Sequence, residues 1–548
     1  MDLRNQNIKK LESTEFDVLI VGGGINGAVS AAALAARGAR VALIEAGDFA
    51  GFTSQQSSNL VWGGIKYMES YEFGLVAGLC KSRNELLRSF PSTVKEIRFL
   101  TTISKGFRFH PLLMLAGTWM YWLFGRGKTQ IPKLLSAAQI EAQEPLINTK
   151  ISRGGIEYSD AYLHDNDARF VFNFVRNAMD RDCVAANYVK SAGASRDDSE
   201  IWTTEVGDQI SGRKFTIRSR VLINATGAFV DSYNKLVGIE TEYKHLFSKG
   251  IHLIVPRLSK HNRVLAFFAD DGRLFFAIPM AHRTCIGTTD TRVDNPYTQV
   301  TDEDRDFVLS NINARLNLPV PLSKNDVIAE RCGVRPLAIK KGQDTETDFL
   351  QLSRKHVVET LHKLGHISIF GGKLTDCLNV GDEVCERVSE LGVRLTAPIG
   401  KWYGEPGSIE RQAYFQRAKK QGLDNIVAKD TNEKLSIRLW RRYGAQANAM
   451  LDAIEKDPTL TDPLIEIGGI RRCEIDYLVE NELIVKLEDF LRRRSKIELL
   501  MSREELKKSA GLYEACEHFF GDEAKAKFDE YFENQDHNDR LDKPLAGN

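Results

Sequence analysis

A chain of 548 residues, 43% hydrophobic and 27% charged, has the composition of a globular enzyme of about two to four domains. Lysine plus arginine and aspartate plus glutamate each total 74, and this zero net charge argues against a general nucleic-acid-binding protein. The eight cysteines form no C-x-x-C pair and the polar start lacks a signal peptide's apolar core, so we expect a cytoplasmic protein with free thiols and no metal site.

The first predicted element is a strand–helix–strand unit near the N-terminus. Apolar runs at 18–21 and 40–44 predict buried parallel strands, and the alanine-rich segment between them predicts a helix. Gly22, Gly24 and Gly27 join the first strand to the helix with the spacing G-x-G-x-x-G. In this context the first glycine allows a tight turn, the second lets the backbone approach a pyrophosphate, and the third lets the helix pack closely on its strand.

The two ends of this unit indicate which nucleotide it binds. The start of the helix, at Ile25 and Asn26, presents unpaired N–H groups and a partial positive charge to phosphates. Glu45 ends the second strand, where its carboxylate can accept hydrogen bonds from ribose hydroxyls and would repel a 2′-phosphate. The unit therefore predicts a dinucleotide-binding domain of the α/β class.

Residues 70–150 are predicted to be mainly helical and contain one unusually apolar segment, PLLMLAGTWMYWLF at 111–124. It is shorter than the roughly 18 apolar residues that a membrane-spanning helix needs. Two tryptophans and a tyrosine near its end, with basic residues at both flanks, are typical of a helix lying in a membrane interface. The other interpretation is a helix buried in the protein core.

The middle of the chain alternates between helix and strand patterns. An amphipathic helix with an aspartate or asparagine cap is predicted at 165–179, and hairpin strands are predicted at 200–222. Short β-rich runs over 250–290 predict an antiparallel sheet that interrupts the nucleotide-binding fold. Two further buried strands are predicted at 221–225 and 367–370.

The predicted domain organisation has three parts. Residues 1–400 form the nucleotide-binding domain, interleaved with a substrate-capping region at about 70–165 and 235–365. A charged, helical pattern then predicts an all-α C-terminal domain at 401–535. Residues 536–548 are predicted to be a disordered tail, because they are polar and end the chain.

Several further segments share a resemblance to one known family. They are TSQQSSNLVWGGIKYME (53–69), VLINATGAFVD (221–231), KGIHLIVP (249–256), IGTTDT (286–291), CGVRPL (332–337) and FGGKLT (370–375). In this order they resemble motif blocks of the FAD-dependent glycerol-3-phosphate dehydrogenases, and 474–499 resembles the helical C-terminal domain of that family. The resemblance implies non-covalent FAD in a glutathione-reductase-like domain of the Rossmann type, an antiparallel β substrate-capping region and an all-α C-terminal domain.

The same resemblance implies an active site. His252 is the candidate base, because an imidazole titrates near neutral pH and can take the proton of an alcohol. Arg335 and Lys373 join it as catalytic candidates; Lys373 follows a Gly-Gly turn at a helix start, where ammonium and helix N-terminus can both stabilise reduced flavin. The candidates for binding the substrate are Lys66, Tyr67, Arg335 and Arg354.

The residues predicted to hold FAD come from five parts of the chain. They are Gly22, Gly24, Ile25, Asn26, Gly27 and Glu45; Thr53, Ser54 and Ser58; Val189; Ala225, Thr226 and Gly227; and Gly371, Gly372, Lys373, Leu374 and Thr375. The hydroxyls at 53–58 are expected to bond the pyrophosphate or the ribityl chain, and Val189 is expected to contact adenine through its backbone. The other interpretation of these residues is local turn capping.

The leading function implied by the resemblance is oxidation of sn-glycerol 3-phosphate to dihydroxyacetone phosphate, with electrons passed to a membrane quinone. One alternative is an oxidase of the wider superfamily that uses oxygen on an amine, an amino acid or another hydroxy phosphate. Another is a flavoprotein without turnover that binds a metabolite as a regulator. Two departures from the family pattern leave that alternative open: Lys66 stands in place of an arginine and Trp62 in place of a histidine.

The expected location is the inner face of the cytoplasmic membrane. Quinones lie in the bilayer, so the protein needs a docking surface, and the segment 111–124 is the first candidate. The basic run 492–496 is the second candidate. The oligomeric state is left open, a homodimer being one candidate.

Overall fold

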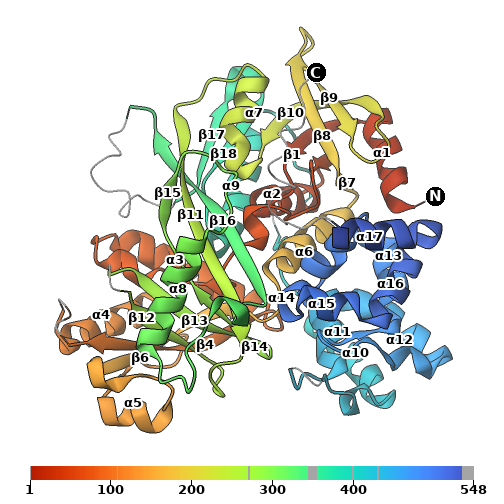
Figure 1. Cartoon of the computed structure of the whole chain (residues 1–548). Helices are drawn as coiled ribbons and strands as arrows, with labels where there is room; N and C mark the ends of the chain where they lie inside the picture. Colours follow the sequence, from red (N-terminus) through yellow and green to blue (C-terminus); the bar gives the residue numbers. More distant parts are fainter. Residues whose placement is uncertain are drawn as a thin grey trace.

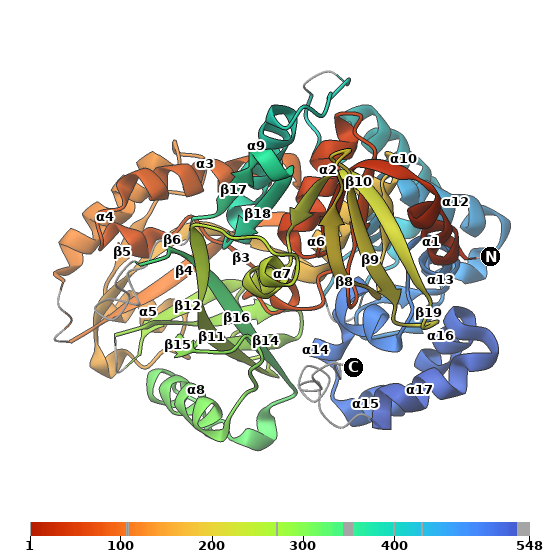
Figure 2. The same cartoon turned by 90° about the horizontal axis from the view of Figure 1, so that it is seen from above.

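The computed structural model describes residues 2–105, 107, 109–269, 272–342, 355–397, 400–428 and 431–533 (Figure 1). Arg354 and the tail predicted at 536–548 lie outside these residues. Two large sheets and a C-terminal set of helices make up the described part of the chain. Figure 2 shows the same elements from above.

The first sheet carries the nucleotide-binding unit. Its strands are β1 (Glu15–Val21), β2 (Val41–Ile44), β7 (Val184–Ala186), β8 (Val189–Arg196), β9 (Trp202–Asp208), β10 (Lys214–Asn224), β17 (Val357–Leu361) and β18 (His366–Phe370). The order β17-β18-β10-β1-β2-β7 places β1 at the centre, parallel to both β2 and β10, and β8 and β9 extend from β10. The predicted strand–helix–strand unit and both further buried strands are confirmed.

Among the described residues, five helices pack around this sheet, and α7 is the shortest of them: α1 (Leu3–Ser13), α2 (Ile25–Ala36), α6 (Asp167–Met179), α7 (Val230–Leu236) and α9 (Cys377–Glu390). The small side chains of α2 let it lie close to the strands, with Ala31, Ala32 and Leu34 fully buried. Helix α6 begins at the predicted cap, because the Asn166 side chain accepts a hydrogen bond from the Ala168 N–H.

The second sheet forms the predicted antiparallel region. Its strands are β3 (Leu60–Val61), β4 (Val94–Ser104), β5 (Lys133–Leu135), β6 (Ser152–Leu163), β11 (Tyr243–Pro256), β12 (Arg263–Phe268), β13 (Leu274–Met280), β14 (Arg283–Gly287), β15 (Thr291–Val293) and β16 (Ala329–Lys340). Strand β11 pairs antiparallel with β16 over most of its length and with β14 over His252–Pro256. One prediction is partly wrong here: 70–150 also supplies β4, a long strand whose β-branched and aromatic residues pair with β6.

The helices of this half are α3 (Phe73–Ser89), α4 (Pro111–Phe124), α5 (Ala137–Gln143) and α8 (Asp302–Arg315). Helix α4 is the apolar segment, and in both views it lies at the end of the molecule away from the C-terminal helices (Figures 1 and 2). Only Thr118 and Tyr121 of α4 are buried, whereas Leu112, Leu113 and Leu123 are each at least 60% exposed. The interpretation of α4 as a core helix is therefore wrong.

The C-terminal part is mainly helical and has a hydrophobic core of its own. It contains α10 (Ser408–Lys420), α11 (Leu435–Tyr443), α12 (Ala447–Lys456), β19 (Pro463–Ile465), β20 (Ile470–Arg471), α13 (Arg472–Asn481), α14 (Ile497–Leu500), α15 (Arg503–Lys507), α16 (Ala510–Phe520) and α17 (Ala524–Glu533). Tyr414, Trp440 and Phe490 lie in this core, each at most 1% exposed. Throughout the described ranges, each helix is too short or too polar to cross a membrane.

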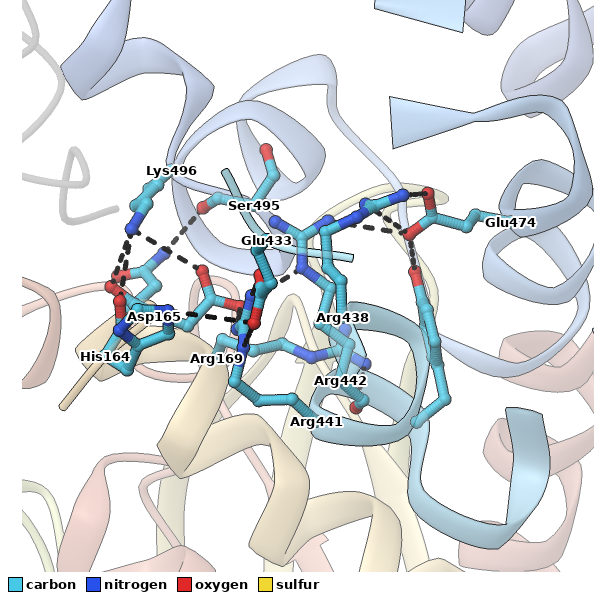
Figure 3. Close-up of polar contacts among 12 residues, drawn as sticks. His164, Asp165, Arg169, Glu433, Arg438, Arg441, Arg442, Glu474, Ser495 and Lys496 are labelled. Carbon is cyan, nitrogen blue, oxygen red and sulfur yellow. Dashed lines mark hydrogen bonds and ion pairs between the residues drawn. The ribbon is translucent and has the colours of Figure 1, made fainter. Parts of the chain in front are cut away.

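Buried ion pairs join the C-terminal helices to the nucleotide-binding domain (Figure 3). Asp165 pairs with Arg441 and Arg442, and Arg169 of α6 pairs with Glu482. These five residues are each at most 7% exposed. Removal of one partner would leave a buried charge without compensation, so the pairs determine how the two parts dock.

The basic run 492–496 belongs to the same interface. Its residues are between 1% and 7% exposed, because their charges pair with acidic groups such as Asp48 and Asp165. The prediction that this run is a second membrane-docking surface is therefore wrong. A run of cations is usually solvated, and the sequence pattern does not reveal that these cations have buried acidic partners.

Candidate active site

The turn between β1 and α2 has the close approaches that its glycines predict. A Cβ at Gly22, whose φ is +108°, would lie 2.5 Å from the carbonyl oxygen of Ala225. A Cβ at Gly27 would overlap the Gly22 carbonyl oxygen. At Gly24 a Cβ would meet only the Ser54 hydroxyl, at 3.4 Å. The backbone at Gly24 is thus the open side of the turn, next to the start of α2, and suits a pyrophosphate.

Glu45 closes one end of this site. Its carboxylate accepts hydrogen bonds from the Gly23 N–H at 2.6 Å and the Gly47 N–H at 2.9 Å. Burial raises the pKa of Glu45, although these backbone bonds act in the opposite direction. The Val189 N–H donates to the Glu45 carbonyl at 2.8 Å. The predicted ribose residue and the predicted adenine residue are therefore neighbours.

Two loops converge on the start of α2. The Ile25 N–H donates to the Ser54 hydroxyl at 3.0 Å, and the Asn26 side chain donates to the Gly371 carbonyl at 3.0 Å. Thr53 and Ser58 lie on the first loop, and the Thr53 hydroxyl donates to the carbonyl of Val334. The second loop continues through Gly372, Lys373, Leu374 and Thr375, while Ala225, Thr226 and Gly227 follow β10 on the facing side.

These parts fit a dinucleotide on structural grounds alone. The loops bring small residues, hydroxyls and backbone N–H groups to one helix N-terminus, as an anionic pyrophosphate requires. Gly371 and Gly372 adopt φ values of +61° and +105°, which let the second loop turn sharply beside α2.

One face of the second sheet carries the candidate catalytic residues. On β11 and β16, His252 lies opposite Arg331, and Ser248 lies opposite Arg335. Directly opposed residues of an antiparallel pair share a face, as do residues two apart on one strand, so these four share one face. Between them a Cβ at Gly333 would contact the Gln56 side chain at 2.7 Å. This face therefore looks onto the loop at 53–58.

His252 is held in a dry, cationic environment. Its ring is 2% exposed, and within the described residues neither ring nitrogen has a hydrogen-bond partner. Burial lowers its pKa to about 3, with further contributions from the positive charges of Arg331 and Arg335. The imidazole is therefore neutral at physiological pH and able to accept a proton.

Arg335 lies beside His252 on the same face. Its guanidinium donates to the Thr288 hydroxyl at 3.1 Å and stands 3.6 Å from a carboxylate oxygen of Asp290. A Cβ at Gly250 would overlap this guanidinium, so the glycine leaves the room that it occupies. The side chain is 27% exposed, which leaves it accessible to a small anion.

Lys373 and Tyr67 form the third part of the site. The Lys373 ammonium lies 3.9 Å above the centre of the Tyr67 ring, a cation–π contact. Tyr67 contacts Trp62, and Trp62 contacts Phe276, which pairs across the strands with Gly287. Gly287 in turn pairs with His252.

A series of contacts therefore links Lys373 and Tyr67 to His252. Lys66 precedes Tyr67 in the same short turn, and the main chain of Trp62 is held by the Thr375 hydroxyl at 3.2 Å. Of the predicted site residues, Arg354 alone falls outside the described residues.

Two residues of this site were missed by sequence reasoning. Arg331 is 1% exposed and donates to the Ser57 carbonyl and to the Asn59 side chain at 2.8 Å. The signal for it was present, because Arg331 and Arg335 lie four apart on one strand and so share a face. Trp62 was noted as a departure from a motif, but its place as an aromatic wall follows only from the sheet.

Comparison with known proteins agrees with this geometry. Residues 17–375 match the family described as FAD dependent oxidoreductase, and 406–522 match the C-terminal domain of alpha-glycerophosphate oxidase. An aerobic glycerol-3-phosphate dehydrogenase of Staphylococcus epidermidis is 31% identical over 510 residues, covering 90% of this chain and 89% of that protein. The chain belongs to the FAD-dependent glycerol-3-phosphate dehydrogenase family. A relative with the same name from Staphylococcus aureus is 30% identical over 512 residues, with the same coverage.

Solved structures of this family have the same fold. Glycerol-3-phosphate dehydrogenase from Bacillus halodurans, complexed with FAD, superposes with a TM-score of 0.73 at 24% identity over 97% of both chains. L-alpha-glycerophosphate oxidase from Mycoplasma pneumoniae, also with FAD bound, gives a TM-score of 0.54 at 18% identity, covering 72% of this chain and 98% of that one. The chain is a flavin-dependent oxidoreductase of mixed α/β fold, and FAD is its cofactor.

Proposed function

We propose that this protein oxidises sn-glycerol 3-phosphate to dihydroxyacetone phosphate. The observation that carries the proposal is the shared sheet face, where a neutral His252 lies beside the accessible guanidinium of Arg335. A phosphorylated secondary alcohol needs both a base for its hydroxyl and a cation for its phosphate. The relatives named aerobic glycerol-3-phosphate dehydrogenase support the same substrate.

The residues then divide the work as follows. His252 takes the proton of the C2 hydroxyl, while Arg335, with Lys66, Tyr67 and Arg354, binds the phosphate. Non-covalently bound FAD would supply the acceptor for the hydride that leaves C2, and Lys373 would place its positive charge near that acceptor.

The low pKa of His252 has a consequence for the reaction. With a pKa of about 3 the imidazole is a weak base before substrate binds. Burial is the main cause of this low pKa, and a dianionic phosphate beside Arg335 would offset the smaller contribution of the positive charges. A substrate without phosphate lacks this effect as well as the binding contact.

An anaerobic titration tests the substrate. Added glycerol 3-phosphate is expected to bleach the flavin absorbance of the purified protein, and glycerol is the matched control that lacks the phosphate. Absence of bleaching by glycerol 3-phosphate would favour the regulator. Equal bleaching by both compounds would contradict the phosphate site.

We further propose that the electrons pass to a membrane quinone and that α4 is the docking surface, at the inner face of the cytoplasmic membrane. The exposed leucines of α4 and its aromatic end suit the headgroup region, where apolar area and basic flanks both contribute to binding. The proposed domains are 1–400 for FAD with its capping region and 401–535 for the helical part, and a homodimer stays one candidate for the assembly.

Oxygen is the second candidate acceptor. The observation in its favour is the match of 406–522 to a domain family named for an oxidase. Hydrogen peroxide formation during turnover in air, at a rate comparable to that with a soluble quinone, would favour oxygen. Turnover with quinone and no peroxide would favour the dehydrogenase.

A further inference from the structure

One π-helical turn of the C-terminal part, Asp489–Arg494, places three consecutive arginines against the nucleotide-binding domain. Arg492, Arg493 and Arg494 are 2%, 3% and 2% exposed. Besides acidic groups of the C-terminal part itself, such as Glu488 and Asp489, they contact the two loops that hold the start and the end of the predicted FAD site.

The first contact is with Asp48. Both terminal nitrogens of Arg494 donate to its carboxylate at 2.8 Å, and Arg493 Nε donates to it at 2.6 Å. The Asn187 side chain adds a fourth hydrogen bond at 2.8 Å. Burial alone would raise the pKa of Asp48, but Arg494 and Arg493 hold it below its usual range, so the carboxylate is charged.

Asp48 is linked through the backbone to the ribose end of the site. It follows Gly47, whose N–H donates to the Glu45 carboxylate. The Gly47 carbonyl accepts from the N–H of Tyr188, and the Tyr188 hydroxyl donates to Asp489 of the π-helical turn at 2.7 Å. The residue after Tyr188 is the predicted adenine contact, Val189.

The second contact is with the loop at 53–58. Arg492 donates to the Gln55 carbonyl and to the Gln56 side-chain oxygen, both at 2.9 Å. Arg493 also donates to the Gln55 side chain at 3.2 Å. Gln55 follows Ser54, whose hydroxyl accepts from the first N–H group of α2. The same turn therefore reaches the pyrophosphate end of the site.

We propose that the C-terminal domain contributes to FAD binding. Arg492, Arg493 and Arg494 position the two loops that hold the adenosine and pyrophosphate of the cofactor. They are positioning residues that act through Asp48 and Gln55. A loop fixed in its bound conformation before the ligand arrives loses less entropy on binding, so FAD affinity depends on ion pairs made by the C-terminal domain.

The alternative is that these pairs only hold the domains together. The chain offers a matched control in Glu474, which accepts from Arg438 at 3.1 and 2.8 Å and from the Tyr443 hydroxyl, and is fully buried (Figure 3). These partners all lie in the C-terminal part, so this is the same kind of carboxylate–arginine pair without contact to the FAD loops.

The test compares Asp48→Asn with Glu474→Gln in the full-length protein. Each apoprotein is titrated with FAD to measure Kd, and its thermal unfolding is followed without FAD. Asp48→Asn is expected to raise the Kd for FAD about tenfold or more, because charge-assisted hydrogen bonds to the loop are lost. Glu474→Gln is expected to leave the Kd for FAD within about twofold of that of the unsubstituted protein. It should lower the unfolding temperature by about as much as Asp48→Asn does, because each variant loses a buried ion pair.

Two outcomes overturn the proposal: a Kd for Asp48→Asn within about twofold of the unsubstituted protein, or an equal rise in Kd for Glu474→Gln. Arg492→Lys is the second variant and decides the question if Asp48→Asn does not fold. Both bonds of Arg492 come from one terminal nitrogen of its guanidinium. Lysine keeps the charge, but its shorter side chain and different donor geometry do not reproduce the two bonds, so Kd is expected to rise several-fold with little change in thermal unfolding. An unchanged Kd in that variant also overturns the proposal.

Discussion

Two glycines of the same turn should respond to substitution in opposite ways. At Gly24 the backbone has φ −74° and ψ −172°, which any residue adopts, and an added Cβ has only the Ser54 hydroxyl nearby. Gly24→Val should therefore fold with a stability change of less than about 1 kcal/mol. Its side chain would occupy the place of the pyrophosphate and separate it from the N–H groups of α2.

The size of the effect follows from those hydrogen bonds. Two charge-assisted bonds of about 1.5–3 kcal/mol each amount to a loss of about 10²–10⁴ in FAD affinity. Gly22→Ala is the contrasting variant, since its Cβ would lie 0.9 Å inside the 3.4 Å at which ordinary contact begins, against the backbone of Ala225. With φ at +108°, strain and overlap should each cost about 1–3 kcal/mol of folding stability.

The assay is flavin content per protein after purification, together with thermal unfolding of the apoprotein. Gly24→Val should be colourless with an unfolding temperature close to that of the unsubstituted apoprotein, whereas Gly22→Ala should unfold at a clearly lower temperature. A Gly24→Val protein that purified with stoichiometric FAD would refute the placement of the cofactor in this turn.

Four further predictions concern the substrate site and the membrane. His252→Ala should keep its flavin and lose about 10²–10⁴-fold in the rate of flavin reduction, measured by stopped flow, and near-normal reduction would rule out the base. The pKa of the His252 imidazole is about 3 in the folded protein and 6.5 in the unfolded chain, so the unfolded state binds more protons between these pH values. The free energy of unfolding should therefore fall as pH drops from about 6.5 towards 3. Denaturant unfolding measured over this pH range should show a smaller fall for His252→Ala. Arg335→Ala should lower kcat/KM for glycerol 3-phosphate by about 10–100-fold, a much larger fold-change than on glycerol, and an equal fold loss on both substrates would argue against a phosphate contact. Leu113→Glu with Leu123→Glu, at positions 61% and 63% exposed, should release the protein from sedimenting vesicles while dye-linked activity persists; if the double variant still pelleted, α4 would not be the docking surface.

The parts of the fold that sequence predicted well are those set by neighbouring residues. The spacing of Gly22, Gly24 and Gly27 between two apolar runs contains the whole local geometry of the turn, so the strand–helix–strand unit and its direction follow from one short segment. The short β-rich runs over 250–290 likewise indicate strands, because runs of β-branched and aromatic residues bounded by turns are typical of buried strands, and β11 and β13 are buried over nearly continuous stretches.

The remaining features depend on pairing between distant segments. The shared face of His252, Arg331 and Arg335 is set by the register of β11 on β16, and no local pattern records that register. The basic run at 492–496 has the composition of a solvated surface, and its burial depends on carboxylates such as Asp48 that lie more than four hundred residues earlier. The sequence pattern of 70–150 does not reveal strand β4, because its pairing partner β6 comes after α4 and α5 in the sequence and no neighbouring segment indicates the pairing.

The long sequence separation of Asp48 from its arginine partners also sets the order in which they are synthesised. Asp48 and Arg493 are 445 residues apart, so at about 5–20 residues per second the ribosome adds the arginine roughly 20–90 s after the aspartate. During that interval the carboxylate of Asp48 in the nascent nucleotide-binding domain lacks its arginine partners. Completion of the loop must then wait until Arg493 and Arg494 are translated, and a chain terminated before them would carry the whole glycine turn without these two partners of Asp48.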